Sequence, residues 1–249
     1  MNKLDLNNLQ NEGVENVPMQ ERRDFLKMGL AITGIFAGGT ILSAVSTFNQ
    51  ASAADFAKKY PYSPHYSMVM HQDRCIDCER CMAACVATNH VPNVPGAYRT
   101  TILEKDTPDA VGGKREFIPV LCNQCNLPQC TRVCPTKATY KDQTTGIVLM
   151  NVKKCIGCLT CQESCPYNAR YFNEEKKAVD KCNFCWDTRL SKGEKDTACA
   201  HACPAGVRIF GDLSKQDDPV FKTVHQIEKA VWVLRPEAGT RPNVFYTKG

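Results

Sequence analysis

Short apolar runs of strand length recur from residue 66 onward, separated by polar, charged or cysteine-containing stretches. Three of them, at residues 66–70, 117–121 and 146–150, stand just before groups of cysteines. Apolar runs of four to eight residues with polar boundaries are typical of buried strands. We therefore predict three short strands, each leading into a cysteine-containing loop.

A fourth pattern predicts a hairpin. The segments Ala-Arg-Tyr-Phe at 169–172 and Ala-Val-Asp at 178–180 flank the charged sequence Glu-Glu-Lys-Lys at 174–177. Two short apolar runs joined by a polar tip indicate paired antiparallel strands. Together with short helices in the cysteine loops, these strands predict an α+β fold.

The N-terminal segment has a different pattern. Glu-Arg-Arg-Asp-Phe-Leu-Lys at 21–27 precedes an uncharged run at 28–48 and Ala-Ser-Ala at 51–53. This order resembles a twin-arginine export signal, although that signal usually has Ser or Thr where Glu21 stands. We predict that residues 1–53 are a signal peptide cleaved after Ala53. The alternative is an uncleaved anchor, but the Gly, Ser and Thr residues make the run only mildly apolar.

The sixteen cysteines fall into four groups of four, and none lies outside these groups. The groups are Cys75, Cys78, Cys81, Cys85; Cys122, Cys125, Cys130, Cys134; Cys155, Cys158, Cys161, Cys165; and Cys182, Cys185, Cys199, Cys203. The first and third groups have the spacing C-x2-C-x2-C-x3-C, which binds iron-sulfur clusters in bacterial ferredoxins. In that arrangement the fourth cysteine ligates the other cluster of a pair. The spacing therefore predicts clusters with ligands shared between groups.

Two other uses of cysteine compete with this interpretation. A disulfide framework suits an exported protein, but disulfide-dense scaffolds are usually shorter than this chain and rarely join C-x-x-C neighbours. Zinc also binds C-x2-C pairs, but its sites typically take two pairs that lie far apart in the sequence. Both alternatives are weaker than iron-sulfur clusters.

Composition and charge fit a protein with clusters in its interior. The chain has 249 residues, of which only 8% are aromatic, and metal centres can replace part of an apolar core. Without residues 1–53 its formal charge changes from +5 to +6. Four clusters of roughly −2 each would bring the total to about −2, which disfavours nucleic acid as a partner. Basic residues beside cysteines are candidates for raising cluster potentials: Arg74, Arg80, Lys153, Lys154 and Lys181.

The order of the groups, the long gap in the fourth and the tail at 233–246 resemble the four-cluster electron-transfer subunits of polysulfide, tetrathionate, formate-dependent nitrite and dimethyl sulfoxide reductases. The likeness covers residues 66–248. It implies two nested ferredoxin-like modules of two [4Fe-4S] clusters each. The outer module would comprise 54–111 and 171–249, and the inner module 112–170.

The same resemblance implies how the cysteines pair. All sixteen ligand positions of that family are cysteines here, so four [4Fe-4S] clusters are expected. The implied ligand sets are a first quartet of Cys75, Cys78, Cys81 and Cys203; a second of Cys85, Cys182, Cys185 and Cys199; a third of Cys122, Cys125, Cys130 and Cys165; and a fourth of Cys134, Cys155, Cys158 and Cys161.

No catalytic triad, phosphate-binding glycine loop or paired carboxylate stands out in the sequence, and electron transfer needs none. The export signal implies a periplasmic location, because the twin-arginine route moves folded, cofactor-loaded proteins. The resemblance implies a non-catalytic subunit that relays electrons between a quinol-interacting membrane subunit and a catalytic subunit with molybdopterin or several haems. The expected substrate is a sulfur compound such as tetrathionate, polysulfide or sulfite. The alternatives are the same role in nitrite reduction, or a free-standing iron-sulfur enzyme.

Overall fold

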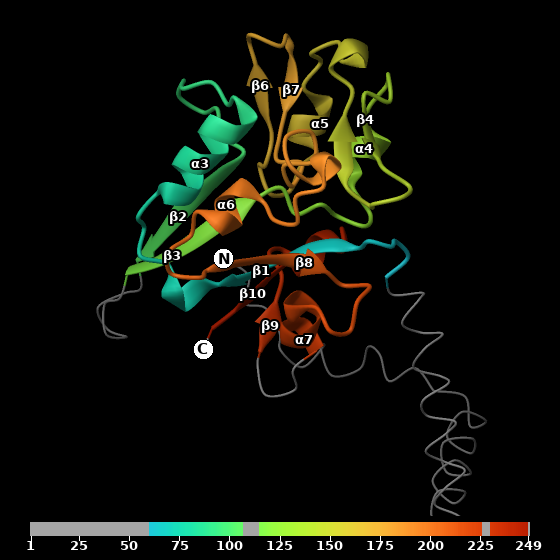
Figure 1. Cartoon of the computed structure of the whole chain (residues 1–249). Coiled ribbons are helices and arrows are strands. Elements are labelled where there is room, and N and C mark those ends of the chain that lie inside the picture. Colours follow the sequence, from blue (N-terminus) through green and yellow to red (C-terminus); the bar gives the residue numbers. More distant parts are fainter. Residues whose placement is uncertain (1–59, 107–114, 226–229, 249) are drawn as a thin grey trace, which may run out of the picture. The chain divides into compact units, whose positions relative to one another are not determined.

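The computed structural model of the chain describes residues 60–106, 115–225 and 230–248, which form short strands, several of them in hairpins, and short helices (Figure 1). The predicted export signal and its cleavage after Ala53 lie outside the described residues. Within the described ranges, no helix combines the length and the apolar character needed to cross a membrane.

A four-stranded sheet joins segments that are far apart in the sequence. Its strands, in spatial order, are β8 (Arg208–Asp212), β1 (Tyr66–His71), β10 (Val244–Thr247) and β9 (Val231–Trp232). β1 pairs antiparallel with β8 and parallel with β10. The middle of β1 is buried on both faces, and α7 (Pro219–His225) lies against β1 and β8. The strand before the first cysteine group is thereby held between the strand after the last group and the C-terminal tail.

Three hairpins complete the strand structure. They are β2 (Thr100–Asp106) with β3 (Arg115–Leu121), β4 (Thr139–Lys141) with β5 (Val148–Met150), and β6 (Tyr171–Asn173) with β7 (Ala178–Asp180). The predicted strands and the predicted hairpin with a charged tip are confirmed. The strand predicted at 146–150 begins two residues later, because Gly146 has φ +67° and closes the turn, where its N–H donates to the carbonyl of Asp142 at 3.0 Å.

Each cysteine group runs into a helix that carries the third cysteine of that group as its second residue. These helices are α3 (Arg80–Asn89), α4 (Gln129–Arg132), α5 (Thr160–Glu163) and α6 (Ala198–His201). α3 contacts α6, and α4 contacts α5. The helix of the first group therefore meets that of the fourth, and the helix of the second meets that of the third.

The core mixes apolar side chains with cysteines. Met68, Met70, Phe184 and Tyr246 are buried in one cluster together with several of the thiols. The described residues from Tyr60 onward pack as one compact unit. The division into an outer and an inner module, with boundaries at 111 and 171, stays a prediction.

Candidate metal centres

All sixteen cysteines are free thiols. Most of them are buried or half-buried, and only Cys78 and Cys158 are exposed. Because none of these sulfur atoms is used in a disulfide, each can bind metal as a thiolate, and the enclosed ones can do so inside the protein.

Three small cavities are each lined by four cysteines. One contains Cys75, Cys78, Cys81 and Cys203; another contains Cys85, Cys182, Cys185 and Cys199; the third contains Cys134, Cys155, Cys158 and Cys161. Each cavity takes three cysteines from one group and a single cysteine from a different group. The structure thus brings together the members of the first, second and fourth quartets.

The thiols of the third quartet also lie close together. The pKa of Cys125 is raised to about 12, first by burial and then by the negative charge of Cys122, Cys130 and Cys165. Burial likewise raises the pKa of Cys165, and the charges of Cys122 and Cys130 add to the increase. The four cysteines therefore share one electrostatic environment, although they come from two groups.

Matching backbone conformations shape the loops of the first and third groups. Asp77 and Gly157, each two residues after the first cysteine of its group, have φ of 54° and 70°. Glu79 and Leu159, two residues further on, have φ of 55° and 59°. Positive φ is uncommon outside glycine and is found at ligand-binding sites. The common spacing C-x2-C-x2-C therefore folds into the same loop twice.

The residues present fit an iron-sulfur cluster. The donor set is thiol only, and four cysteines surround one space, as a [4Fe-4S] cluster requires. Among the described residues, no three Cys, His, Asp or Glu side chains form a group that could hold a single metal ion.

The quartets lie in a definite order. Burial raises the pKa of Cys182 well above its usual value, and the charges of its own quartet and of Cys122 add to this. Cys122 belongs to the third quartet, so the second and third quartets are neighbours. In the same way, Cys81 lies near Cys199 and Cys161 lies near Cys130. The order is first, second, third, fourth, and the exposed Cys78 and Cys158 belong to the two quartets at its ends.

Hydrogen bonds reach several of the sulfur atoms. The Asn89 side-chain amide donates to Sγ of Cys85 at 3.5 Å and to Sγ of Cys185 at 3.4 Å. Backbone N–H groups of Phe184 and Val207 donate to Sγ of Cys182 and Cys203, both at 3.4 Å. Donors of this kind stabilise the negative charge on a ligand and tune the potential of a cluster. Asn89 was not predicted, because its distance in sequence from Cys185 gives no signal.

The structure corrects the predicted set of basic residues. Arg74, Arg80, Lys153 and Lys154 are exposed, although each stands close to a cysteine in the sequence. Solvent screens such charges. Only Lys181 of the predicted set is buried, and its ammonium group donates to the carbonyls of Val148 and Cys182.

Other cations lie inside the protein instead. Arg99, Arg170 and Arg208 are buried beside cysteines, and Lys141 is largely enclosed. Burial lowers the pKa of Lys141 to about 8, and its ammonium group donates to the carbonyl of Cys125 at 2.9 Å. These residues were missed because none of them stands next to a cysteine in the sequence.

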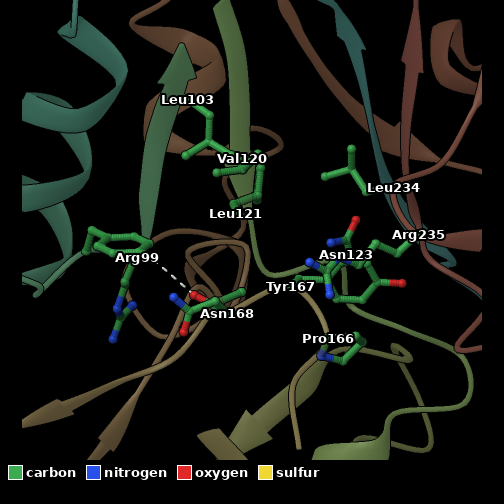
Figure 2. A pocket seen from close by; sticks show the side chains of 12 residues that line it. Arg99, Leu103, Val120, Leu121, Asn123, Pro166, Tyr167, Asn168, Leu234 and Arg235 are labelled. Carbon is green, nitrogen blue, oxygen red and sulfur yellow. Dashed lines mark hydrogen bonds between the residues drawn. The ribbon is translucent and has the colours of Figure 1, made fainter. Parts of the chain in front are cut away.

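A cavity of about 330 Å³ has no cysteine in its lining, although Arg99 lines both this cavity and that of the second quartet. Figure 2 shows Leu103, Val120 and Leu121 of the β2–β3 hairpin on one side of it and Leu234 on another. The buried Arg99 in its wall is engaged by Asp180. The lining is mainly apolar, so within the ranges that the structure describes the cysteine quartets are the candidate centres.

Comparison with known proteins agrees with this chemistry. Residues 114–213 match the family described as "4Fe-4S dicluster domain". The chain is 38% identical over 201 residues to the B subunit of tetrathionate reductase from Salmonella typhimurium, covering 76% of this chain and 78% of that one. It is 40% identical over 184 residues to the B component of polysulfide reductase from Wolinella succinogenes, covering 72% and 92%. The thiosulfate reductase electron transfer subunit PhsB of Salmonella typhi is 37% identical over 152 residues, covering 61% and 78%.

Proposed function

Because this chain belongs to the family of iron-sulfur subunits of multi-subunit reductases that carry the 4Fe-4S dicluster domain, we propose that it relays electrons through four [4Fe-4S] clusters. The cofactors are [4Fe-4S] clusters, and the chain is a non-catalytic subunit, as its relatives are. The number of clusters, their ligands, the partners and the location are the parts that we propose.

The proposal assigns one cluster to each quartet. Its main support is the set of cysteine-lined cavities, in which three cysteines of one group meet a single cysteine of another. The contacts of α3 with α6 and of α4 with α5 support the nested pairing of the groups. When bound, the clusters supply one-electron oxidation and reduction. The protein holds them in one row and shields the second quartet, whose four cysteines are all buried.

The two ends of the row are the proposed places of electron exchange. Cys78 of the first quartet and Cys158 of the fourth are exposed ligands. Beside them, Ile76 is 66% exposed and Ile156 is 65% exposed, and each lies two residues before the exposed cysteine. An apolar side chain next to a surface ligand suits close contact with another protein, because it is readily desolvated.

We further propose the partners and the setting. One end would meet a polytopic membrane subunit that oxidises quinol, and the other a catalytic subunit with molybdopterin or several haems. The relatives named for tetrathionate, polysulfide and thiosulfate reductases support a sulfur compound as the final acceptor. The sequence at 21–53 supports export to the periplasm by the twin-arginine route.

Analysis of the purified chain tests the central claim. Four clusters predict about sixteen iron atoms and as many acid-labile sulfides per chain, a broad absorption near 400 nm and reversible reduction. Paramagnetic signals after reduction should account for about four spins. Iron content of about half that value would reduce the proposal to a single module, and a colourless zinc protein would reject it.

A further inference from the structure

Two buried arginines occupy equivalent positions in the chain. Arg170 is the fifth residue after Cys165, Arg208 is the fifth residue after Cys203, and proline follows the cysteine in both cases. Arg170 stands just before β6, and Arg208 begins β8. The repeated sequence Cys-Pro-x-x-x-Arg thus ends at the start of a strand on both occasions.

Their polar contacts correspond as well. Nη2 of Arg208 donates to Oγ1 of Thr100 at 2.9 Å, and Nη2 of Arg170 donates to Oγ1 of Thr139 at 2.9 Å. The same Nη2 atom of Arg208 lies 3.5 Å from Sγ of Cys81, to which it also donates. Nη1 of Arg170 donates to Sδ of Met150 at 3.6 Å, and the Arg170 guanidinium also has Cys130 as a hydrogen-bond partner. Each guanidinium is therefore held by a threonine hydroxyl while it faces cysteine sulfur.

Each arginine lies between two quartets. Arg208 lines the cavity of the first quartet, and against the lowering effect of burial the thiolates of Cys199 and Cys81 raise its pKa. These two cysteines belong to the second and first quartets. For Arg170 the opposing thiolates are chiefly Cys130, Cys122 and Cys161, from the third and fourth quartets.

Neither arginine forms an ion pair with a carboxylate in the part of the chain that the structure describes, although they are only 3% and 4% exposed. Arg99 differs, since its guanidinium is paired with Asp180 at 2.8 Å. A buried cation without a counter-charge is strongly disfavoured. The negative charge beside Arg170 and Arg208 comes from cysteine ligands, and a bound cluster would carry that charge.

We propose that Arg170 and Arg208 are matched counter-charges, one for each pair of clusters, which raise the reduction potentials of the two clusters beside them. The inference rests on the proposed function, because it requires clusters in the quartets. Reduction adds one negative charge to a cluster, and a cation held nearby in a medium of low dielectric favours the reduced form. The threonine hydroxyls keep the guanidinium at the right place.

The test is a redox titration of the full chain, followed by electron paramagnetic resonance, with Arg208→Met and Arg170→Met. We expect the ratio of reduced to oxidised cluster at a given potential to fall about tenfold, or about 59 mV for one electron. Arg208→Met should affect the first and second quartets, and Arg170→Met the third and fourth. Arg74→Met is the matched control, because Arg74 precedes Cys75 but is exposed, and its titration should stay near that of the parent chain.

Iron and sulfide content separates this inference from the proposed function. A parent chain without four clusters would reject the proposed function itself. Methionine variants with full cluster content and unchanged redox titrations would overturn the inference. The same holds if Arg170→Lys and Arg208→Lys lower the reduction potential as much as the Met variants do, since lysine keeps the positive charge. If a Met variant fails to assemble its clusters, the redox titrations of Thr100→Val and Thr139→Val test the inference instead, because these variants remove the hydroxyl that holds the guanidinium. A fall in potential confined to the module of the altered threonine supports the inference, and an unchanged potential rejects it.

Discussion

The guanidinium of Arg99 and the carboxylate of Asp180 form a buried ion pair, with Nη2 and Oδ1 2.8 Å apart. Arg99 stands just before β2 and Asp180 ends β7, so the pair ties the start of one hairpin to the end of another. Asp180 also accepts hydrogen bonds from Lys176 and from the hydroxyl of Tyr171. One carboxylate therefore organises the surroundings of the second quartet.

Asp180→Ala should destabilise the protein strongly. Removal of one partner leaves Arg99 buried without its carboxylate, which typically costs about 3–5 kcal/mol. The free energy of unfolding, measured by chemical denaturation of the cluster-loaded protein, would show the loss. Asp106→Ala is the matched control, because Asp106 and its partner Arg115 have side chains that are 72% and 59% exposed. The control should cost less than about 1 kcal/mol, and equal effects of the two variants would contradict the assigned role of the buried pair.

The turn between β4 and β5 should make stability depend on pH through Asp142. Its carboxylate accepts hydrogen bonds from the backbone N–H and the hydroxyl of Thr145, at 2.7 and 2.6 Å. Burial alone would raise the pKa of Asp142, but these hydrogen bonds lower it, and the net direction is downward. A lowered pKa in the folded state stabilises the protein above the usual aspartate pKa of about 4, and this contribution is lost as pH falls through the folded value.

Asp142→Asn should therefore cost about 1 kcal/mol near pH 7, the typical contribution of one hydrogen bond. The difference from the parent chain should begin to shrink as pH falls towards about 4, where the clusters still have to be intact. Thermal unfolding of both proteins across this range measures it. A difference that is constant with pH would show that the charge of Asp142 plays no part.

Cys203→Ser and Cys78→Ser should alter the same cluster. The two residues are 125 positions apart in the sequence, but they line one cavity. Both variants should change or remove one paramagnetic signal and leave those of the third and fourth quartets in place. Cys134→Ser, which alters the fourth quartet, is the comparison. If Cys203→Ser instead changed the same signal as Cys185→Ser, the proposed nested pairing would be wrong.

Ile76→Glu and Ile156→Glu should impair electron exchange without loss of clusters. A buried, unpaired charge at an interface weakens binding by about 1.4 kcal/mol or more, which is at least tenfold. In the assembled complex, one variant should slow exchange with the membrane subunit and the other exchange with the catalytic subunit. Val94→Glu is the control, since Val94 is also exposed but lies outside the cysteine-lined cavities. Equal rates in all three variants would place the contacts elsewhere.

Much of the local structure follows from the sequence. The apolar runs predicted the strands before the first three cysteine groups, and the charged tip predicted the hairpin of β6 and β7. Such features depend on residues that are neighbours in the chain, so their pattern is visible in the sequence. The ends of the predicted strands were less accurate, as at Gly146, which lies in a turn held by hydrogen bonds to Asp142 and not in the strand.

By itself, the sequence determined the kind of chemistry, because the spacing of cysteines within a group sets which sulfur atoms can share a loop. The tertiary structure alone decided which charges act on those sulfurs. Arg74 stands beside a ligand in the chain but lies in solvent, whereas Arg170 and Arg208 stand five residues away and are buried between quartets. The strength of a charge on its neighbours depends on distance through space and on the surrounding dielectric, and folding sets both.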